Sequence, residues 1–192
     1  MLEKIFYYYC IIFMNMIFCM CNGMHDFFSR FIQAVLHIQI ILKIRIHKEL
    51  MMLKNIPELI SPALLKVLCE MGHGDEIVIG DGNFPAASNA RNLIRADGIG
   101  AAEMLEAILQ LFPLDQYDDN NFVLMQKCDG DDTDTSVWEE YQRILNKYEP
   151  GAEVSFEERF AYYERARHAY AVIATGEKRQ YANIILKKGC VL

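Results

Sequence analysis

Beyond residue 50, apolar and polar residues alternate with periods that predict helices and strands in turn. Ser61 can cap a helix that has Pro62 at its first position, a favoured arrangement at helix starts. The apolar residues that follow recur every three or four positions and mark one helical face; they are Leu64, Leu65, Leu68 and Met71. Gly72 ends this helix, and residues 76–80, with the apolar run Ile77-Val78-Ile79, then predict a buried strand.

The rest of the chain continues this alternation. It predicts strands at 92–96, 122–127, 169–174 and 184–187, and helices at 101–112 and from Val137 onward. Ser155 and Glu158 fit a capping box and predict another helix that begins there. Strands and helices that alternate along one chain are typical of α/β domains. We therefore expect a single α/β domain with a mostly parallel or mixed sheet and helices on both faces.

Residues 1–50 differ in composition from the domain predicted at 51–192. They are rich in Phe, Ile, Tyr, Met, Lys and Asn, with few acids. The apolar run 5–21 has about the length of a signal-peptide core, but Glu3 offsets its only basic flank, Lys4, and a membrane span needs ~20 apolar residues. Three interpretations of this extension stay open: sequence translated upstream of a start near Met51, a signal or anchor, and an amphipathic helix at 27–46.

Charge and cysteine content narrow the classes of partner. The formal net charge is −7 and the acids concentrate after residue 50, which argues against nucleic-acid binding. The six cysteines form no C-x-x-C pair and show no ligand spacing with histidine, so they predict neither a zinc site nor a disulfide framework. We expect a cytoplasmic protein, or a secreted or membrane-anchored one if residues 1–50 act as a signal or anchor.

Several polar residues lie where predicted strands or helices end. His73 stands between two glycines before a strand, and Asp81 follows that strand at its carboxyl end, the edge where α/β sheets bind ligands. Further candidates are Arg159, Tyr163, Glu164, Tyr181 and Asn183. Structural alternatives exist: His73 could stabilise a helix dipole, Asp81 could form a turn, the tyrosines could pack, and the charges on the helix could be solvated.

The sequence contains no clear cofactor motif. Gly80-Asp81-Gly82 lacks the third glycine of a dinucleotide fingerprint. The acidic run 129–134 lacks the sixth-position glycine of a calcium-binding EF-hand loop, so it is more typical of a solvated loop before a helix. We therefore expect chemistry that needs no metal, nucleotide or other cofactor.

A series of short motifs runs in order from about Leu53 to Val191. They are Met71-Gly72-His73-Gly74-Asp75-Glu76, Asn83-Phe84-Pro85, Ile94-Arg95-Ala96-Asp97-Gly98, Arg159-Phe160, Tyr163-Glu164-Arg165-Ala166, Thr175-Gly176-Glu177, Tyr181-Ala182-Asn183 and Lys187-Lys188-Gly189. Together they resemble the L-fucose mutarotase family, relatives of the bacterial D-ribose pyranases. Asn83 is closer to the animal members, because bacterial members often have histidine there. Residues 1–50 have no counterpart in the family.

The resemblance implies an RbsD/FucU-like fold and roles for particular residues. It makes His73, in the Gly-His-Gly turn, the proton donor, and it implies that Asp81, Arg159 and the run 181–183 hold the sugar. Ala182 stands where the family usually has glycine, a change that matters mainly if the loop requires a positive φ. The family forms ring-like oligomers in which a neighbouring subunit completes each site, so we expect a homo-oligomer.

We therefore predict an isomerase that interconverts the α and β anomers of L-fucose by acid/base-catalysed ring opening. His73 is the acid, and Tyr163 or a bound water is the candidate second proton carrier. The predicted substrate contacts are Asp81, Arg159, Tyr163, Tyr181, Ala182 and Asn183. A D-ribose pyranase or broader sugar mutarotase, and a non-catalytic monosaccharide-binding or assembly protein, stay open as alternatives. A membrane partner is expected only if residues 1–50 supply an anchor.

Overall fold

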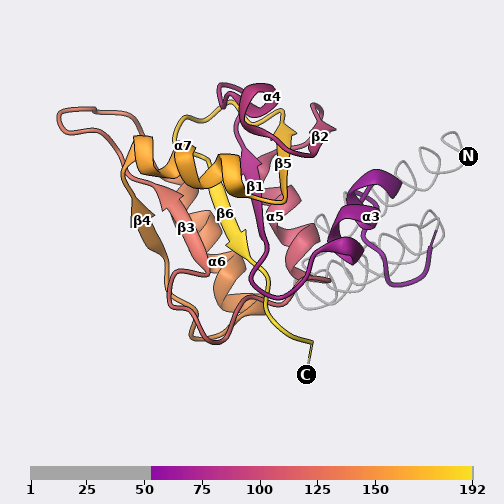
Figure 1. Cartoon of the computed structure of the whole chain (residues 1–192). Coiled ribbons are helices and arrows are strands. Elements are labelled where there is room, and N and C mark those ends of the chain that lie inside the picture. Colours follow the sequence, from indigo (N-terminus) through magenta and orange to yellow (C-terminus); the bar gives the residue numbers. More distant parts are fainter. Residues whose placement is uncertain (1–52, 192) are drawn as a thin grey trace, which may run out of the picture. The chain divides into compact units, whose positions relative to one another are not determined.

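The computed structural model describes residues 53–191, which form a six-stranded mixed sheet with helices on both faces (Figure 1). The strands are β1 (Glu76–Gly80), β2 (Leu93–Ala96), β3 (Phe122–Met125), β4 (Ser155–Glu157), β5 (Ala171–Thr175) and β6 (Ile184–Lys187). The helices are α3 (Pro62–Glu70), α4 (Ala86–Asn89), α5 (Ala101–Leu109), α6 (Val137–Tyr148) and α7 (Arg159–His168). The expected α/β class with a mixed sheet is confirmed.

The three interpretations of residues 1–50 lie outside the described residues and stay predictions. Within residues 53–191, no helix is both long and apolar enough to cross a bilayer.

The strand order is β2-β5-β1-β6-β3-β4, and β6 runs against all its neighbours. The other pairings in the sheet are parallel. Ile184, at the start of β6, therefore pairs with Ile79 near the carboxyl end of β1, while Lys187 pairs with Glu76 at its amino end. The loop before β6 is thus brought to the carboxyl edge of the parallel strands, and the chain after β6 lies at the amino edge.

Both faces of the central strands are buried, with side chains alternating between two cores. Ile77 and Ile79 pack in one core with residues of α3, α5 and α6, whereas Val78 packs in the other with residues of α4 and α7. This is the period of two expected for a strand. Because both faces are covered, β1 reads in the sequence as a continuous apolar run rather than an alternating one.

The predicted start of the first helix is confirmed by its cap. The Ser61 hydroxyl accepts a hydrogen bond from the Leu64 N–H at 3.2 Å, and Pro62 is the first helical residue. The predicted packing face of α6 is also confirmed, since Tyr141 and Leu145 are fully buried and Trp138 packs against the same core.

The helix predicted to begin at the Ser155 capping box is wrong in its start. Residues 155–157 form β4, an edge strand whose backbone pairs in parallel with β3. Glu158 is the cap instead, because its Oε2 accepts hydrogen bonds from the N–H groups of Phe160 and Ala161. Pairing with a distant strand, which the local sequence does not report, delays the helix to Arg159. The short helix α4 was also missed.

Candidate functional site

The loops at the carboxyl edge of the sheet surround a cavity of about 200 Å³. Its lining comes from the turn after β1, the end of β3, the first turns of α7 and the loop before β6. The residues are Asp81, Asn83, Phe84, Met125, Arg159, Tyr163, Gln180, Tyr181 and Asn183. All predicted substrate-binding residues except Ala182 are among them. The volume is below the ~300–1,000 Å³ of pockets for drug-sized ligands, which suits a small polar molecule.

Asp81 and Asn183 form a reciprocal pair in this lining. The Asn183 amide donates to Oδ2 of Asp81 at 3.0 Å, and the Asp81 N–H donates to Oδ1 of Asn183 at 2.9 Å. Oδ1 of Asp81 accepts the Asn83 N–H at 2.9 Å, which closes the turn that the sequence suggested as the structural alternative. Burial raises the pKa of Asp81, although these hydrogen bonds oppose the shift. Asp81 thus shapes the turn and also offers the cavity a buried acceptor for hydroxyl groups.

The loop before β6 is held by two aromatic residues of α6. The Trp138 indole donates to the carbonyl oxygen of Tyr181 at 2.8 Å, and the Tyr141 hydroxyl donates to that of Ala182 at 3.1 Å. Among the described non-glycine residues, only Tyr181 and Asn55 have a positive φ. Alanine at 182, where the family usually has glycine, is therefore free of the strain that a positive φ would cause.

The Tyr181 hydroxyl forms a hydrogen bond with the acidic run 129–134, which the sequence predicts to be a solvated loop. It donates to Oδ2 of Asp131 at 2.5 Å, and this bond raises the pKa of Tyr181 to about 12. Hydrogen bonds from Thr133 and Tyr181 hold the pKa of Asp131 at about 2. Within residues 53–191, no group of three or more His, Cys, Asp or Glu side chains could hold a metal ion. The acidic loop thus positions one wall of the cavity.

Helix α7 begins at the same edge and contributes a cation and a phenol to the lining. The Arg159 guanidinium lies over the Phe160 ring at 4.7 Å, and none of the ion pairs among residues 53–191 includes it. It can therefore donate hydrogen bonds to a bound ligand. The Tyr163 ring packs 5.7 Å from that of Phe84. Glu164 is exposed and pairs with Arg167 and His168 on the helix surface, as the solvated alternative predicts.

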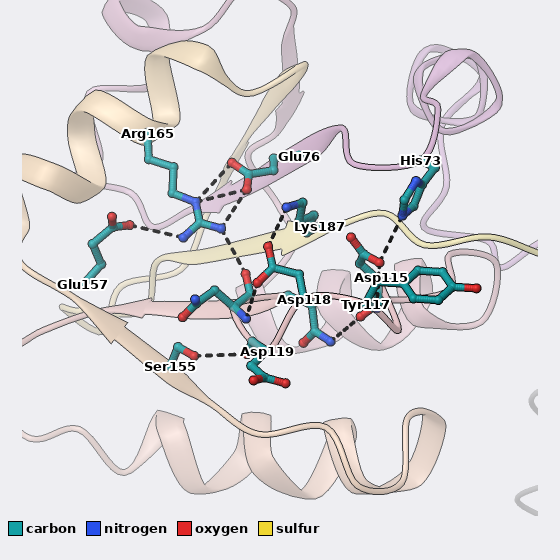
Figure 2. A network of polar contacts seen from close by, with 12 residues as sticks. His73, Glu76, Asp115, Tyr117, Asp118, Asp119, Ser155, Glu157, Arg165 and Lys187 are labelled. Carbon is teal, nitrogen blue, oxygen red and sulfur yellow. Dashed lines mark hydrogen bonds and ion pairs between the residues drawn. The ribbon is translucent and has the colours of Figure 1, made fainter.

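His73 lies at the opposite edge of the sheet, before β1, where its Nε2 is 3.1 Å from Oδ1 of Asp115 (Figure 2). The Tyr117 ring contacts the imidazole edge-on at 5.9 Å between centroids. The five residues of β1 separate His73 from Asp81, and at ~3.3 Å per residue they span roughly 16 Å. One chain therefore gathers the predicted sugar contacts other than Ala182 in one cavity but does not bring His73 to them.

Several residues that the structure places at these sites were given no site role by the sequence analysis: Asn83, Phe84, Met125 and Gln180 in the cavity lining, and Asp115 beside His73. Gln180 lines the cavity and accepts a hydrogen bond from the Thr133 hydroxyl at 3.2 Å. Gln180 directly precedes the predicted sugar contact Tyr181, so its place in the sequence could have identified it as a cavity residue. Asp115 is 42 residues from His73 in the sequence, and no local pattern links the two.

Glu177 fastens the loop that leads into the cavity. Its carboxylate accepts hydrogen bonds from the Arg179 guanidinium and from backbone N–H groups of Lys178 and Arg179. The bond to Arg179 is the main reason that the pKa of Glu177 falls from 4.5 to about 2. Its carbonyl oxygen accepts the N–H of Gly82, next to Asp81, at 2.8 Å. Loss of this charge should therefore loosen the cavity.

Glu177→Gln should lower the free energy of unfolding at pH 7 by about 1.5–3 kcal/mol, the usual worth of hydrogen bonds to a charged group. The pKa of Glu177 in the folded protein lies below its ordinary value. The extra stability of the wild type over Glu177→Gln should therefore be complete above about pH 4.5 and should shrink as the pH falls toward about 2. Urea denaturation at pH 7 and pH 3 measures both effects. Glu153→Gln removes the same charge from an exposed position and should change little. A stability difference that persists undiminished at pH 3 would contradict this.

Comparison with known proteins gives matches over this same domain. Residues 54–191 match the RbsD / FucU transport protein family. The L-fucose mutarotase of Actinobacillus pleuropneumoniae serotype 5b is 52% identical over 139 residues, which cover 72% of this chain and 96% of that protein. The crystal structure of FucU from Bifidobacterium longum is 50% identical with a TM-score of 0.70, covering 72% of this chain and all of that one.

A second solved structure is the fucose mutarotase from Streptococcus pneumoniae in complex with L-fucose. It is 48% identical with a TM-score of 0.69, and the match covers 73% of this chain and all of that one. The match to the family model spans most of the chain and the similar proteins are matched over nearly their whole length. The chain therefore belongs to the RbsD/FucU family.

Proposed function

We propose that this protein is an L-fucose mutarotase, an isomerase that interconverts the α and β anomers of the sugar. The observation that carries the proposal is the cavity at the carboxyl edge. It gathers Asp81, Arg159, Tyr163 and Asn183 in a volume suited to a small polar ligand, in a chain half identical to a protein named L-fucose mutarotase. A similar solved protein is in complex with L-fucose, which supports the same substrate.

The residues of the cavity suit a sugar rather than an apolar ligand. Asp81 supplies acceptors for hydroxyl groups, the Asn183 amide and the Arg159 guanidinium supply donors, and the aromatic ring of Tyr163 can pack against a sugar face. These groups bind and orient the substrate. The lining contains no imidazole, so His73, the proton donor that we assign, must reach the sugar from outside this lining.

Mutarotation requires two proton movements. One proton goes onto the ring oxygen as the bond between C1 and that oxygen breaks, and one leaves the anomeric hydroxyl. Imidazole, with a reference pKa of ~6.5, can serve in both directions near neutral pH. His73 is the residue to which we assign the first transfer, with Tyr163 or a bound water as the candidate carrier for the second.

We infer that the working protein is a homo-oligomer in which His73 of one subunit faces the cavity of a neighbour. The separation of His73 from the cavity by the length of β1 supports this arrangement. So does the exposure of the groups around it, since the side chain of His73 is 48% exposed and Tyr117 is 77% exposed. An exposed histidine and an exposed aromatic ring side by side suit insertion into a neighbouring subunit.

The proposed activity is tested by NMR saturation transfer between the anomeric protons of L-fucose, with and without the full chain. We expect exchange to accelerate at catalytic amounts of protein, and D-ribose tested in parallel reports the substrate preference. Binding of L-fucose without accelerated exchange would leave a sugar-binding protein and refute the mutarotase. Acceleration with D-ribose alone would point instead to a pyranase.

A further inference from the structure

Side chains of helix α6 hold two successive carbonyl groups of the loop before β6. The Trp138 indole N–H donates to the carbonyl oxygen of Tyr181 at 2.8 Å, and the Tyr141 hydroxyl donates to that of Ala182 at 3.1 Å. Trp138 and Tyr141 are three residues apart, so they share one face of the helix. Neither is among the described residues that line the cavity. The helix therefore fixes the loop from outside the cavity.

The peptide unit between Tyr181 and Ala182 links this helix to Asp81. Its carbonyl oxygen is the acceptor of the Trp138 indole. Burial raises the pKa of Asp81, and the N–H of Ala182 is one of the backbone groups that oppose the rise, so it faces the Asp81 carboxylate. A trans peptide unit is planar, with its C=O and N–H directed to opposite sides. An oxygen held by Trp138 therefore also sets the direction of the N–H toward Asp81.

Tyr181 does not favour this arrangement by itself. Its φ of 56° lies in the left-handed region, which residues other than glycine seldom adopt. Such a conformation persists only where surrounding contacts determine it. At Tyr181 these contacts are the Trp138 indole on the carbonyl oxygen and Oδ2 of Asp131, which accepts the hydroxyl at 2.5 Å. Loss of the indole bond should therefore let the peptide unit turn away from Asp81.

The indole is a well-fixed donor. The backbone N–H of Trp138 donates to the Thr135 carbonyl at 2.9 Å in the first turn of α6. The ring lies 5.0 Å from that of Phe156 on β4 and packs against the core. A large aromatic ring that is packed on its faces and has one N–H directed at an acceptor can hold that acceptor in place.

We propose that Trp138 is a positioning residue for sugar recognition: its indole N–H fixes the peptide unit 181–182, so that Asp81 and Tyr181 keep the arrangement that binds L-fucose. This rests on the proposed mutarotase function. Trp138 does not touch the substrate, and His73 lies at the other edge of the sheet. The effect of losing the indole N–H should therefore fall on KM and leave kcat nearly unchanged.

The test removes the donor and keeps the ring. Trp138 is the one tryptophan of the full chain. Its replacement by benzothienylalanine, in which sulfur takes the place of the indole N–H, therefore changes this position alone. We expect KM for L-fucose anomer exchange to rise by ~3- to 10-fold, the usual worth of one hydrogen bond, with kcat within about twofold. An unchanged KM, or a loss confined to kcat, would overturn the proposal.

Tyr148→Phe is the matched control. It also removes one hydrogen bond made by an aromatic residue of α6, because the Tyr148 hydroxyl donates to Oε1 of Glu106 at 3.1 Å, away from the loop before β6. This variant should keep KM and kcat near their wild-type values. A rise in KM equal to that of the tryptophan isostere would mean that any weakening of α6 has this effect, and would refute a specific role for Trp138.

A second measurement follows the peptide unit directly and does not depend on activity. Amide hydrogen exchange by NMR should be faster at Ala182 in the isostere by ~3- to 10-fold, while Val78 within β1 keeps its wild-type rate. An unchanged rate at Ala182 would contradict the proposed contact. If wild type neither binds L-fucose nor accelerates its exchange, the mutarotase function fails, while this measurement still decides whether Trp138 holds the peptide unit.

The double variant tests whether the effect passes through Asp81. In the Asp81→Asn background, the isostere should weaken L-fucose binding less than it does in wild type, because the carboxylate that the Ala182 N–H faces is already lost. Titration calorimetry gives the four affinities. Losses of the same size in both backgrounds would show that Trp138 and Asp81 act independently, and the proposal would be wrong.

Discussion

Replacing His73 with alanine should slow L-fucose anomer exchange by ~10²–10⁴-fold, because general acid–base catalysis contributes about that much. The binding of L-fucose should be nearly unchanged, since the groups assigned to hold the sugar lie in the cavity at the other edge of the sheet. Saturation transfer gives the exchange rate, and titration calorimetry gives the affinity. The substitution removes an exposed side chain, so the fold should remain intact.

Asp81→Asn is the matched contrast to this variant. It removes the buried acceptor paired with Asn183 and should weaken sugar binding, while His73 and Asp115 keep their geometry. The two substitutions therefore separate proton transfer from recognition. Exchange at the wild-type rate in a folded His73→Ala protein would remove the histidine from the mechanism.

Co-expression of His73→Ala with Asp81→Asn should restore activity that neither variant has alone. If each site takes its histidine from one subunit and its cavity from another, random mixing in equal amounts leaves about a quarter of the sites with both wild-type parts. We therefore expect about a quarter of the wild-type rate, measured at low sugar concentration. This effect follows from the placement of His73 and the cavity at opposite edges of β1.

The control is a mixture of the two proteins purified separately and combined under conditions where subunits do not exchange. That mixture should remain as inactive as its components. If the co-expressed sample also shows no recovery although both chains are present in one oligomer, then each site is built from a single chain, and the inferred arrangement is wrong. Sedimentation of the active sample establishes whether an oligomer is present.

Local sequence determined the elements whose signals lie within a few residues. Ser61 and Pro62 set the start of α3, and the apolar run 77–79 predicted the strand β1 at 76–80, because both faces of that strand are buried. Their polar chemistry and their places at the ends of elements made Asp81, Arg159, Tyr163 and Tyr181 candidates, the resemblance supported Asp81, Arg159 and Tyr181, and the structure gathers all four around the cavity. These assignments needed no knowledge of which strands pair.

Tertiary structure alone decided how these pieces combine. The pairing of β6 against β1 brings Asn183 to Asp81, 102 residues away, and the same strand carries its other end to the edge of His73. Residues 155–157 pair with the distant strand β3, so the helix predicted at the Ser155 capping box does not begin there. Asp115 lies 42 residues from His73, and no local pattern indicated that the two side chains would be in contact. Local patterns report which side of an element is buried, but register and direction depend on contacts between distant segments, and those contacts set which residues share an edge.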